Sequence, residues 1–223
     1  MHVEWYGQSA FRLAAATATV VIDPFGDLSG LAERGISFEY PPIAGAVADL
    51  VLVTHEHADH NGVEVVAGDP RVLRSTAGTL DSPIGEVTAI ASEHDATAGT
   101  ERGPNTIFAF ELDGTRVAHL GDLGQRALRD EQAAAIGPVE LLFVPVGGGP
   151  TIDAQQAAAI VEQLAPRWVV PMHYRTPRLS FLDDAEPFLA RMDHVRRLDA
   201  PVFDTEELAG EQGRPLAVVP ASP

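Results

Sequence analysis

The stretch Leu50-Val51-Leu52-Val53-Thr54-His55-Glu56-His57-Ala58-Asp59-His60 joins a continuous apolar run to a cluster of potential metal ligands. An apolar run of this length indicates a strand that is buried on both faces. The residues that follow such a strand lie on the loops where α/β proteins concentrate function. The segment therefore predicts a layered α/β fold with a functional site at the end of a buried strand.

Two imidazoles one residue apart, His55 and His57, can point at one cation, and the next pair, Asp59 and His60, can reach a second cation beside it. Neutral imidazole and carboxylate ligands suit zinc, and also manganese or iron. The alternative is a polar turn in which these side chains only cap and hydrogen-bond. Four such groups packed together after an apolar strand favour a metal site.

The composition narrows the chemistry further. The 223 residues include 32 Asp and Glu against 15 cations, all arginine, for a formal net charge of −17, and there is no cysteine. Without lysine there is no Schiff-base nucleophile, and without cysteine there is no thiolate, disulfide or Cys-type metal site. The acidic balance argues against nucleic acid and anionic membranes as partners. The beginning of the chain lacks the pattern of a signal peptide, and no apolar run reaches membrane-spanning length, so we expect a cytoplasmic protein.

Apolar and turn patterns predict the remaining elements. A hairpin is expected around Asp113-Gly114, and a helix is expected after Asp153, whose capping box would be completed by Gln156. A last helix is expected over 184–198, and residues 26–48 are expected to form a long loop. The predicted strands cover 10–13, 17–22, 50–53, 71–74, 86–91, 106–112, 115–120, 141–144, 168–170 (stopped by Pro171) and 215–219.

The run Thr54 to His60 resembles the H-x-H-x-D-H motif of the metallo-β-lactamase superfamily of dinuclear metal hydrolases. Later elements match the family in order: His94 after a strand, Asp122 in Gly121-Asp122, and His173 in Pro171-Met172-His173-Tyr174. The resemblance implies a four-layered αββα sandwich of two mixed β-sheets flanked by helices, formed by residues 1–223 as a single domain. It also implies two divalent ions, Zn²⁺ first and Mn²⁺ or Fe²⁺ as alternatives. One ion would be held by His55, His57 and His94 and the other by Asp59, His60 and His173, with Asp122 bridging.

The glycine-rich segment Gly147-Gly148-Gly149-Pro150-Thr151-Ile152-Asp153 and the later Pro171-Met172-His173-Tyr174 are similar to a branch of small hydrolases that includes ascorbate-6-phosphate lactonase. The resemblance implies hydrolysis of a small-molecule lactone, ester or amide, with Asp59 and Asp122 as the catalytic acids. A phosphodiesterase or nuclease and a non-catalytic metal-binding protein are the alternatives. The expected partner is a small-molecule substrate, and a homo-oligomer is possible.

Several residues keep two interpretations. Glu93 or Asp95 could coordinate in place of His94, and Asp23 is either a turn former or a pocket residue. His119 is expected to be a core residue or to orient a ligand, and Asp153 to be an N-cap, although its loop could face the metals. His2 and His194 are expected at the surface. Candidate substrate-binding residues are Arg102, Asn105, Tyr174 and Arg175.

Overall fold

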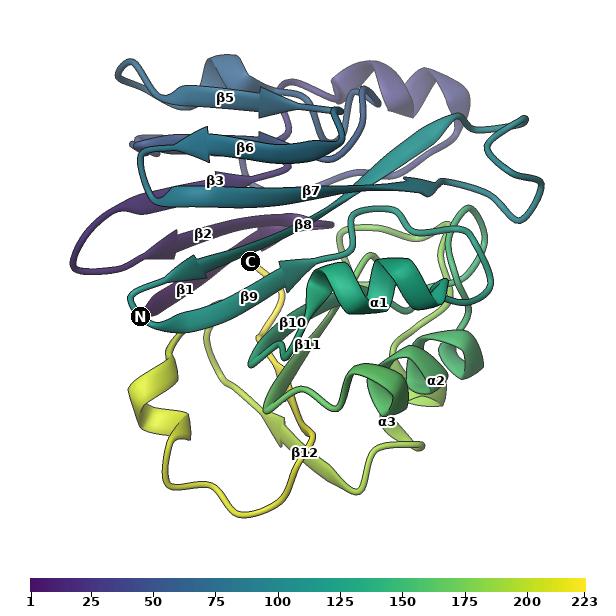
Figure 1. Ribbon diagram of the computed structural model, residues 1–223. Coiled ribbons are helices and arrows are strands. Elements are labelled where there is room, and N and C mark those ends of the chain that lie inside the picture. Colours follow the sequence, from purple (N-terminus) through teal and green to yellow (C-terminus); the bar gives the residue numbers. More distant parts are fainter.

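The computed structural model describes residues 1–223, the side chain of Arg34 excepted, and consists of two mixed β-sheets packed face to face (Figure 1). In the six-stranded sheet the order is β13-β1-β2-β3-β4-β5, and in the eight-stranded sheet it is β12-β14-β11-β10-β9-β8-β7-β6. Each sheet has an antiparallel part and a parallel part. The expected sandwich of two mixed sheets is confirmed.

The strands of the six-stranded sheet are β1 (His2–Gly7), β2 (Ala10–Ala14), β3 (Thr19–Ile22), β4 (Leu50–Val53), β5 (Arg71–Arg74) and β13 (Val202–Asp204). The strands of the eight-stranded sheet are β6 (Gly78–Ser82), β7 (Gly85–Glu93), β8 (Pro104–Leu112), β9 (Thr115–His119), β10 (Leu141–Pro145), β11 (Trp168–Met172), β12 (His194–Arg197) and β14 (Leu216–Val219). The helices are α1 (Asp130–Ile136), α2 (Ala154–Leu164) and α3 (Glu186–Leu189), with short 3-10 turns η1 (Ser29–Arg34), η2 (Val63–Val65) and η3 (Thr205–Leu208).

The main core lies between the sheets and beneath the α-helices. Alternate residues of β4 divide between two clusters: Leu50 and Leu52 join the main core, whereas Val51 and Val53 pack in a smaller cluster on the outer face of the six-stranded sheet. That smaller cluster includes Ala48 and Val66, from loop segments. The layer outside the six-stranded sheet is therefore built from loops and 3-10 turns, while α1, α2 and α3 lie together beside the eight-stranded sheet (Figure 1).

Local signals are confirmed where they are strongest. Asp113 and Gly114 both have positive φ, 47° and 75°, as a type I′ hairpin turn requires. Asp153 caps α2 by accepting a hydrogen bond from the backbone N–H of Gln156 at 2.8 Å, and the Gln156 side chain accepts one from the backbone N–H of Asp153 at 3.0 Å. The long loop between β3 and β4 is also observed, interrupted by η1.

Two predicted elements, one helix and one strand, end at other residues than expected. The helix expected over 184–198 stops at Leu189, and His194–Arg197 forms an edge strand whose hydrogen bonds go to β14 instead of to a helix. The strand expected to stop at Pro171 continues to Met172. On one side it stays paired with β10 as far as Met172, whereas on the other side β14 pairs only with Trp168 and Val169, so that side of β11 is unpaired at Pro171. A missing N–H is tolerated on such a free side. The sequence patterns also did not identify β1, β6, β13 or α1.

Candidate metal centre

Four loops that follow strands bring the predicted metal ligands to one end of the sandwich. The segment Thr54 to His60 follows β4 of the six-stranded sheet, whereas the other three loops follow strands of the eight-stranded sheet. These three loops carry His94 at the end of β7, Asp122 after β9 and His173 after β11. The ligands thus lie on loops that begin at strand ends, and these loops bring residues from both sheets together.

The carboxylate of Asp122 is the centre of the cluster. Its Oδ2 atom lies 3.1 Å from His173 Nε2, 3.3 Å from His60 Nε2 and 3.4 Å from His94 Nε2. The Nε2 atom of His55 is 3.9 Å from the same oxygen. All five residues are almost fully buried. One oxygen atom therefore faces four imidazole nitrogens from three other loops.

The ligand atoms fall into overlapping groups whose members lie within 4.8 Å of one another. One group is His55, His57 and His94, a second is Asp59, His60 and His173, and a third joins His55 and His60 through Asp122. The first two groups match the sets implied by the family resemblance. The third places Asp122 between them.

The donors fit a metal ion in their spacing. Two nitrogen ligands ~2.0–2.1 Å from a tetrahedral zinc ion lie roughly 3.3 Å apart. The Nε2 atom of His60 is 3.5 Å from Asp59 Oδ2 and 3.3 Å from Asp122 Oδ2. That buried nitrogen is in hydrogen-bonding geometry with no atom of the described residues. An orphaned nitrogen among carboxylates at ligand spacing is what a cation would satisfy.

The tautomers of His60 and His55 also suit metal binding. Asp23 can only accept at pH 7, so His60 donates from Nδ1 at 2.9 Å and presents Nε2 to Asp122. Thr54 gives its hydroxyl proton to Asp23 at 2.7 Å, so its oxygen accepts from His55 Nδ1 at 3.0 Å. In both histidines Nε2, which faces Asp122, is thus the nitrogen left to bind a metal; Nε2 of His55 also lies 3.1 Å from His57 Nδ1.

Burial sets the charge of two histidines. It lowers the pKa of His55 to about 2, an effect to which the neighbouring His60 adds, and it lowers the pKa of His94. Both side chains are therefore neutral at pH 7, the form that binds a metal.

His60 behaves differently. Burial opposes its charge, but the carboxylates of Asp122, Asp59 and Asp23 raise its pKa well above the usual value. Although burial also opposes the charge of Asp122, His173 and His60 hold the pKa of Asp122 well below the usual value. A metal ion would replace the proton that these carboxylates hold on His60.

The turn between β1 and β2 supplies contacts that sequence reasoning missed. The side chain of Gln8 is fully buried and donates from Nε2 to Asp59 Oδ2 at 3.1 Å, while its backbone oxygen accepts from the N–H of His173 at 3.3 Å. Ser9 donates to Asp122 Oδ1 at 3.3 Å. The polar pair Gln8-Ser9 between two apolar strands was a signal for a site, although it could not say which ligands it would meet.

Asn105 is a correction, because its side chain holds the Asp122 loop and does not face a substrate. Its amide donates to Ser92 Oγ at 2.8 Å and to the backbone oxygen of Leu120 at 2.9 Å, and its Oδ1 accepts from Asp122 N–H at 3.0 Å. A Cβ atom on Gly121 would lie 2.3 Å from that Oδ1, so the close approach requires glycine. His119, also buried, accepts from Gly121 N–H at 3.1 Å and orients the same turn, as expected.

Asp95 organises the loop after His94 instead of replacing His94 in the cluster. Its carboxylate accepts hydrogen bonds from the backbone N–H groups of Thr97, Gly99, Glu101 and Arg102 at 2.8–3.0 Å. Glu93 forms an ion pair with Arg129 at 2.9 Å. These contacts leave His94 as the residue of this loop that faces Asp122.

Of the other substrate candidates, Arg102 alone lines the cavity over the cluster. This cavity has a volume of 330 Å³ and is lined by His57, Asp59, His94, Asp122, His173 and Arg102 together with an apolar wall. The guanidinium of Arg102 forms no ion pair with the described carboxylates. Tyr174 is buried against Trp5 with ring centroids 5.6 Å apart, and Arg175 is exposed outside the lining, so both differ from the expectation.

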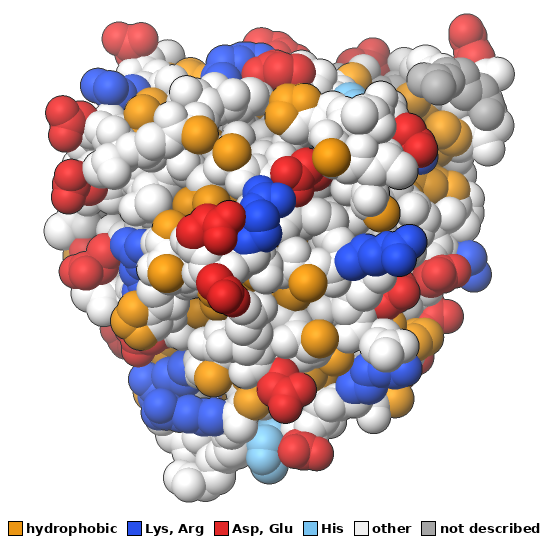
Figure 2. Space-filling view, turned by 45° about the vertical axis from the view of Figure 1, so that its right-hand side comes forward, with side chains coloured by type: hydrophobic (Ala, Val, Ile, Leu, Met, Phe, Trp, Pro, Cys, Tyr) orange, Lys and Arg blue, Asp and Glu red, His pale blue; other side chains and the backbone are white. Residues whose placement is uncertain are grey.

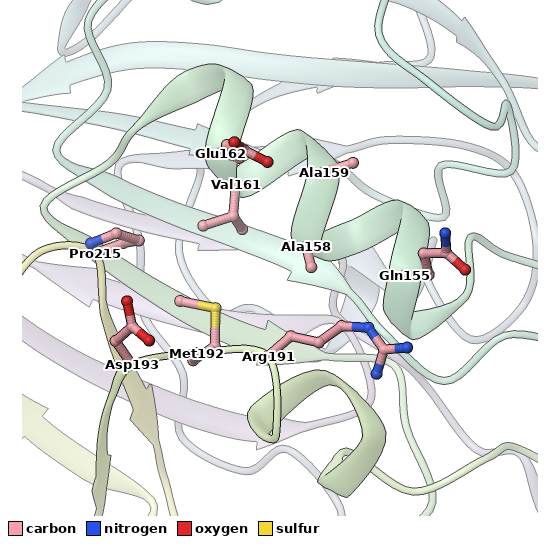
Figure 3. Close-up of a pocket in the computed structure, with 9 residues that line it drawn as sticks. All are labelled: Gln155, Ala158, Ala159, Val161, Glu162, Arg191, Met192, Asp193 and Pro215. Atoms are coloured by element: carbon pink, nitrogen blue, oxygen red, sulfur yellow. The ribbon is translucent and has the colours of Figure 1, made fainter.

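A larger cavity, of 570 Å³, lies between α2 and the segment before β12 (Figure 3). Alanines, Val161 and Met192 line it with Gln155, Glu162, Arg191 and Asp193. It contains no histidine and none of the metal-ligand candidates. The residue types therefore identify the 330 Å³ cavity, which lies at the ligand cluster, as the candidate site. His2 and His194 lie outside the cluster at the surface, as expected.

Comparison with known proteins agrees with this geometry. The model of the β-lactamase superfamily domain matches residues 2–173. A UPF0173 metal-dependent hydrolase from Thermococcus kodakarensis is 31% identical over 202 residues, which cover 78% of this chain and 84% of that protein. Another from Hyperthermus butylicus is 30% identical, covering 90% of this chain and 94% of that protein.

A solved structure from Thermotoga maritima, assigned to the zinc-dependent hydrolases of the metallo-β-lactamase superfamily, shares the fold with a TM-score of 0.76. It is 29% identical, and the match covers 98% of this chain and 97% of that one. In the described chain no helix is long and apolar enough to cross a membrane. From its sequence, its sheets and its histidine–aspartate cluster, this chain belongs to the metallo-β-lactamase superfamily and is a metal-dependent hydrolase.

Proposed function

We propose that the chain binds two divalent ions, with Zn²⁺ favoured over Mn²⁺ or Fe²⁺, and hydrolyses a lactone, ester or amide bond of a small molecule. The observation that carries the proposal is the position of Asp122 Oδ2, within 3.1–3.9 Å of imidazoles from both ligand groups. A carboxylate in that position suits a bridge between two cations. The ligand set is intact, which argues against a non-catalytic relative.

His55, His57 and His94 would hold one ion, and Asp59, His60 and His173 the other. Two such cations would lower the pKa of water from ~15.7 to about 7 and would polarise the bond under attack. Water oxygen bonds to the carbonyl carbon, the bond from that carbon to the leaving group breaks, and the leaving group takes up a proton.

The protein's own contribution is to hold these groups in place. Gln8 donates to Asp59 Oδ2, the oxygen that lies 3.5 Å from His60 Nε2, and so holds this carboxylate at the cluster. Ser9 and Asn105 hold Asp122 through its carboxylate and its backbone N–H. Ligands fixed in this way keep their geometry when substrate replaces water.

The cavity supports a small substrate. Arg102 lines both the 330 Å³ cavity and an adjoining 240 Å³ cavity that reaches His55 and Ser75. In this position it would bind a carboxylate, phosphate or carbonyl oxygen of the substrate. The finer resemblance to ascorbate-6-phosphate lactonase remains a prediction.

A phosphodiester could be cleaved by the same ligand set, but charge argues against a nucleic acid. The chain carries a net charge of −17. On the described face in Figure 2, basic side chains lie in small groups among acidic ones and form no continuous basic stripe. A polyanion would therefore gain little from this surface.

Metal analysis and a substrate panel test the proposal. Purified protein should contain about two divalent ions, and Asp122→Ala should lose both a bridging ligand and hydrolysis of lactone, ester and bis-phosphodiester probes. Asp113→Ala, which changes an exposed carboxylate at a hairpin, is the control. A protein that takes up no zinc, manganese or iron would refute the proposal. Faster cleavage of the bis-phosphodiester than of the ester or lactone would favour the phosphodiesterase alternative.

A further inference from the structure

A second cavity lies beside the one over the ligand cluster. It has a volume of 290 Å³ and is lined by the β3–β4 loop, including Phe25, Tyr40 and Ile43. Leu28 and Phe38 line this inner cavity and also the 330 Å³ cavity that holds the ligand cluster. These two side chains therefore form the partition between the metal-ligand cluster and a neighbouring, mainly apolar cavity, which is called the inner cavity because it lies under the β3–β4 loop on the far side of the partition and not because it is more enclosed.

The walls of the inner cavity are mainly hydrocarbon. Phe25, Phe38 and Tyr40 pack together, with ring centroids 5.0 Å apart for Phe25 and Phe38 and 5.2 Å apart for Phe38 and Tyr40. Pro42, Ile43 and Val65 extend the apolar wall, and the exposed Asp27 and Ser29 belong to the same lining. These residues form an apolar cluster that is separate from the main core.

The partition itself is accessible. Leu28 and Phe38 are only half-buried, and Leu31 and Ile36 extend the apolar wall outward along the same cavity. Phe181 stands at its edge with 46% of its surface exposed. Phe181 therefore adds to the accessible apolar wall of the cavity, which an apolar part of a ligand can cover.

The opposite wall of the outer cavity is polar. It contains the ligand cluster, from His57 to His173, together with Arg102. The site is thus divided: metal ligands and one cation on one side, hydrocarbon on the other. A substrate that satisfies both walls has a polar reacting group and an apolar tail.

We infer that the substrate carries an aliphatic chain, which runs from the scissile carbonyl past Leu28 and Phe38 into the inner cavity. The inference rests on the proposed hydrolase function and names the class of substrate: an ester, amide or lactone with a medium-length hydrocarbon chain on its acyl side. The β3–β4 loop is then the element that sets chain-length specificity.

A series of p-nitrophenyl esters tests this with the metal-loaded protein. From acetate through butyrate and hexanoate to octanoate, kcat/KM should rise about fourfold for each added methylene, the factor that corresponds to ~0.8 kcal/mol of buried CH₂. The rise should stop when the inner cavity is full. A flat or falling series, with the acetate still hydrolysed, overturns the inference and leaves the hydrolase function standing.

Leu28→Trp tests the route, because the larger side chain would close the partition. The ratio of kcat/KM for hexanoate to that for acetate should fall towards one in Leu28→Trp. It should be retained in Ala44→Trp, which is exposed on the same loop outside both linings. Equal ratios in the two variants overturn the assignment of the chain to this cavity. Thermal unfolding of both variants checks that they fold.

A binding experiment separates failure of the inference from failure of the proposed function. Titration of octanoate and butyrate into metal-free protein should show tighter binding of octanoate, and Leu28→Trp should remove the difference. If no ester of any length is hydrolysed, the proposed function fails, and this titration alone decides the inference. Equal binding of the two carboxylates overturns it.

Discussion

Replacing Asp23 with asparagine changes the charge and one hydrogen-bonding atom of a residue that lines none of the cavities described above. Asp23 nevertheless holds His60 through a hydrogen bond. Asp23 is fully buried and has positive φ, 48°, which asparagine tolerates as aspartate does. Its carboxylate accepts from Thr54 N–H at 2.8 Å, from the Thr54 hydroxyl at 2.7 Å and from His60 Nδ1 at 2.9 Å. The perturbation therefore leaves the backbone as it is and acts on two side chains.

In Asp23→Asn the amide oxygen can still accept from Thr54 N–H, but the amide nitrogen takes the place of Oδ2. That nitrogen donates, so it favours a His60 tautomer with the proton on Nε2. Nε2 is the atom that faces Asp122 at 3.3 Å and would bind the metal. Substitutions of residues that orient a metal-binding histidine cost about 10–100-fold in metal affinity, and we expect a loss in that range.

The cost in stability should be smaller for asparagine than for alanine. Asp23→Asn leaves one buried donor poorly satisfied, about 1–3 kcal/mol in the free energy of unfolding. Asp23→Ala removes one member of a buried pair and should cost ~3–5 kcal/mol. The difference between the variants separates the tautomer effect on metal binding from general loss of structure.

The assay is competition for zinc between the protein and a chromogenic chelator, with urea unfolding of the metal-free protein alongside. Asp113→Asn is a matched control, because Asp113 also has positive φ, 47°, and its carboxylate also accepts from a backbone N–H and a threonine hydroxyl, those of Ala16 and Thr17, but at an exposed turn. Equal zinc affinity in Asp23→Asn and Asp113→Asn would refute the reasoning.

Three further outcomes are expected. Arg102→Ala should raise KM about tenfold for anionic esters, which corresponds to the loss of ~1.4 kcal/mol from one charged contact, and should leave KM for neutral esters little changed. The control Arg175→Ala should change KM for neither kind of ester. Equal effects of the two variants on KM would contradict the role given to Arg102. Burial lowers the pKa of His55 to about 2 and also lowers that of His94, whereas histidines of the unfolded chain titrate near 6.5. Below about pH 6.5 the unfolded chain therefore binds more protons than the folded chain. The free energy of unfolding of the metal-free protein should fall as pH drops below that value. The raised pKa of His60 adds no slope below about 6.5, because its stabilising contribution is complete there and is lost progressively as pH rises from about 6.5 towards the folded value. Urea titrations with chelator from about pH 6.5 to 5 therefore measure the trend, and a free energy of unfolding that increases as pH falls over this range would contradict it. Asn105→Ala should lower the free energy of unfolding by about 2–4 kcal/mol and loosen the Asp122 loop, because three buried groups lose their hydrogen-bond partner. A urea midpoint equal to that of the unmodified protein would contradict that role.

The sequence alone was sufficient for features that depend on neighbouring residues. The apolar run Leu50–Val53 had to be a buried strand, and His55 to His60 had to follow it within one turn. The Asp113-Gly114 turn and the Asp153 cap are likewise set by the chemistry of a few adjacent residues. Local patterns failed at 184–198, where pairing with β14 replaced a helix.

The tertiary structure decided which distant residues complete the site. Gln8 meets Asp59 across 51 positions and Ser9 meets Asp122 across 113, and neither contact has a local pattern that announces it. The same holds for Asn105, whose amide is used up by the Asp122 loop, and for the apolar partition of Leu28 and Phe38. The physical reason is that local periodicity determines which residues follow a strand and can act as ligands. The groups that hold those ligands and the walls of the cavities come from segments distant in the sequence, and only the packing of the sheets and loops brings them together.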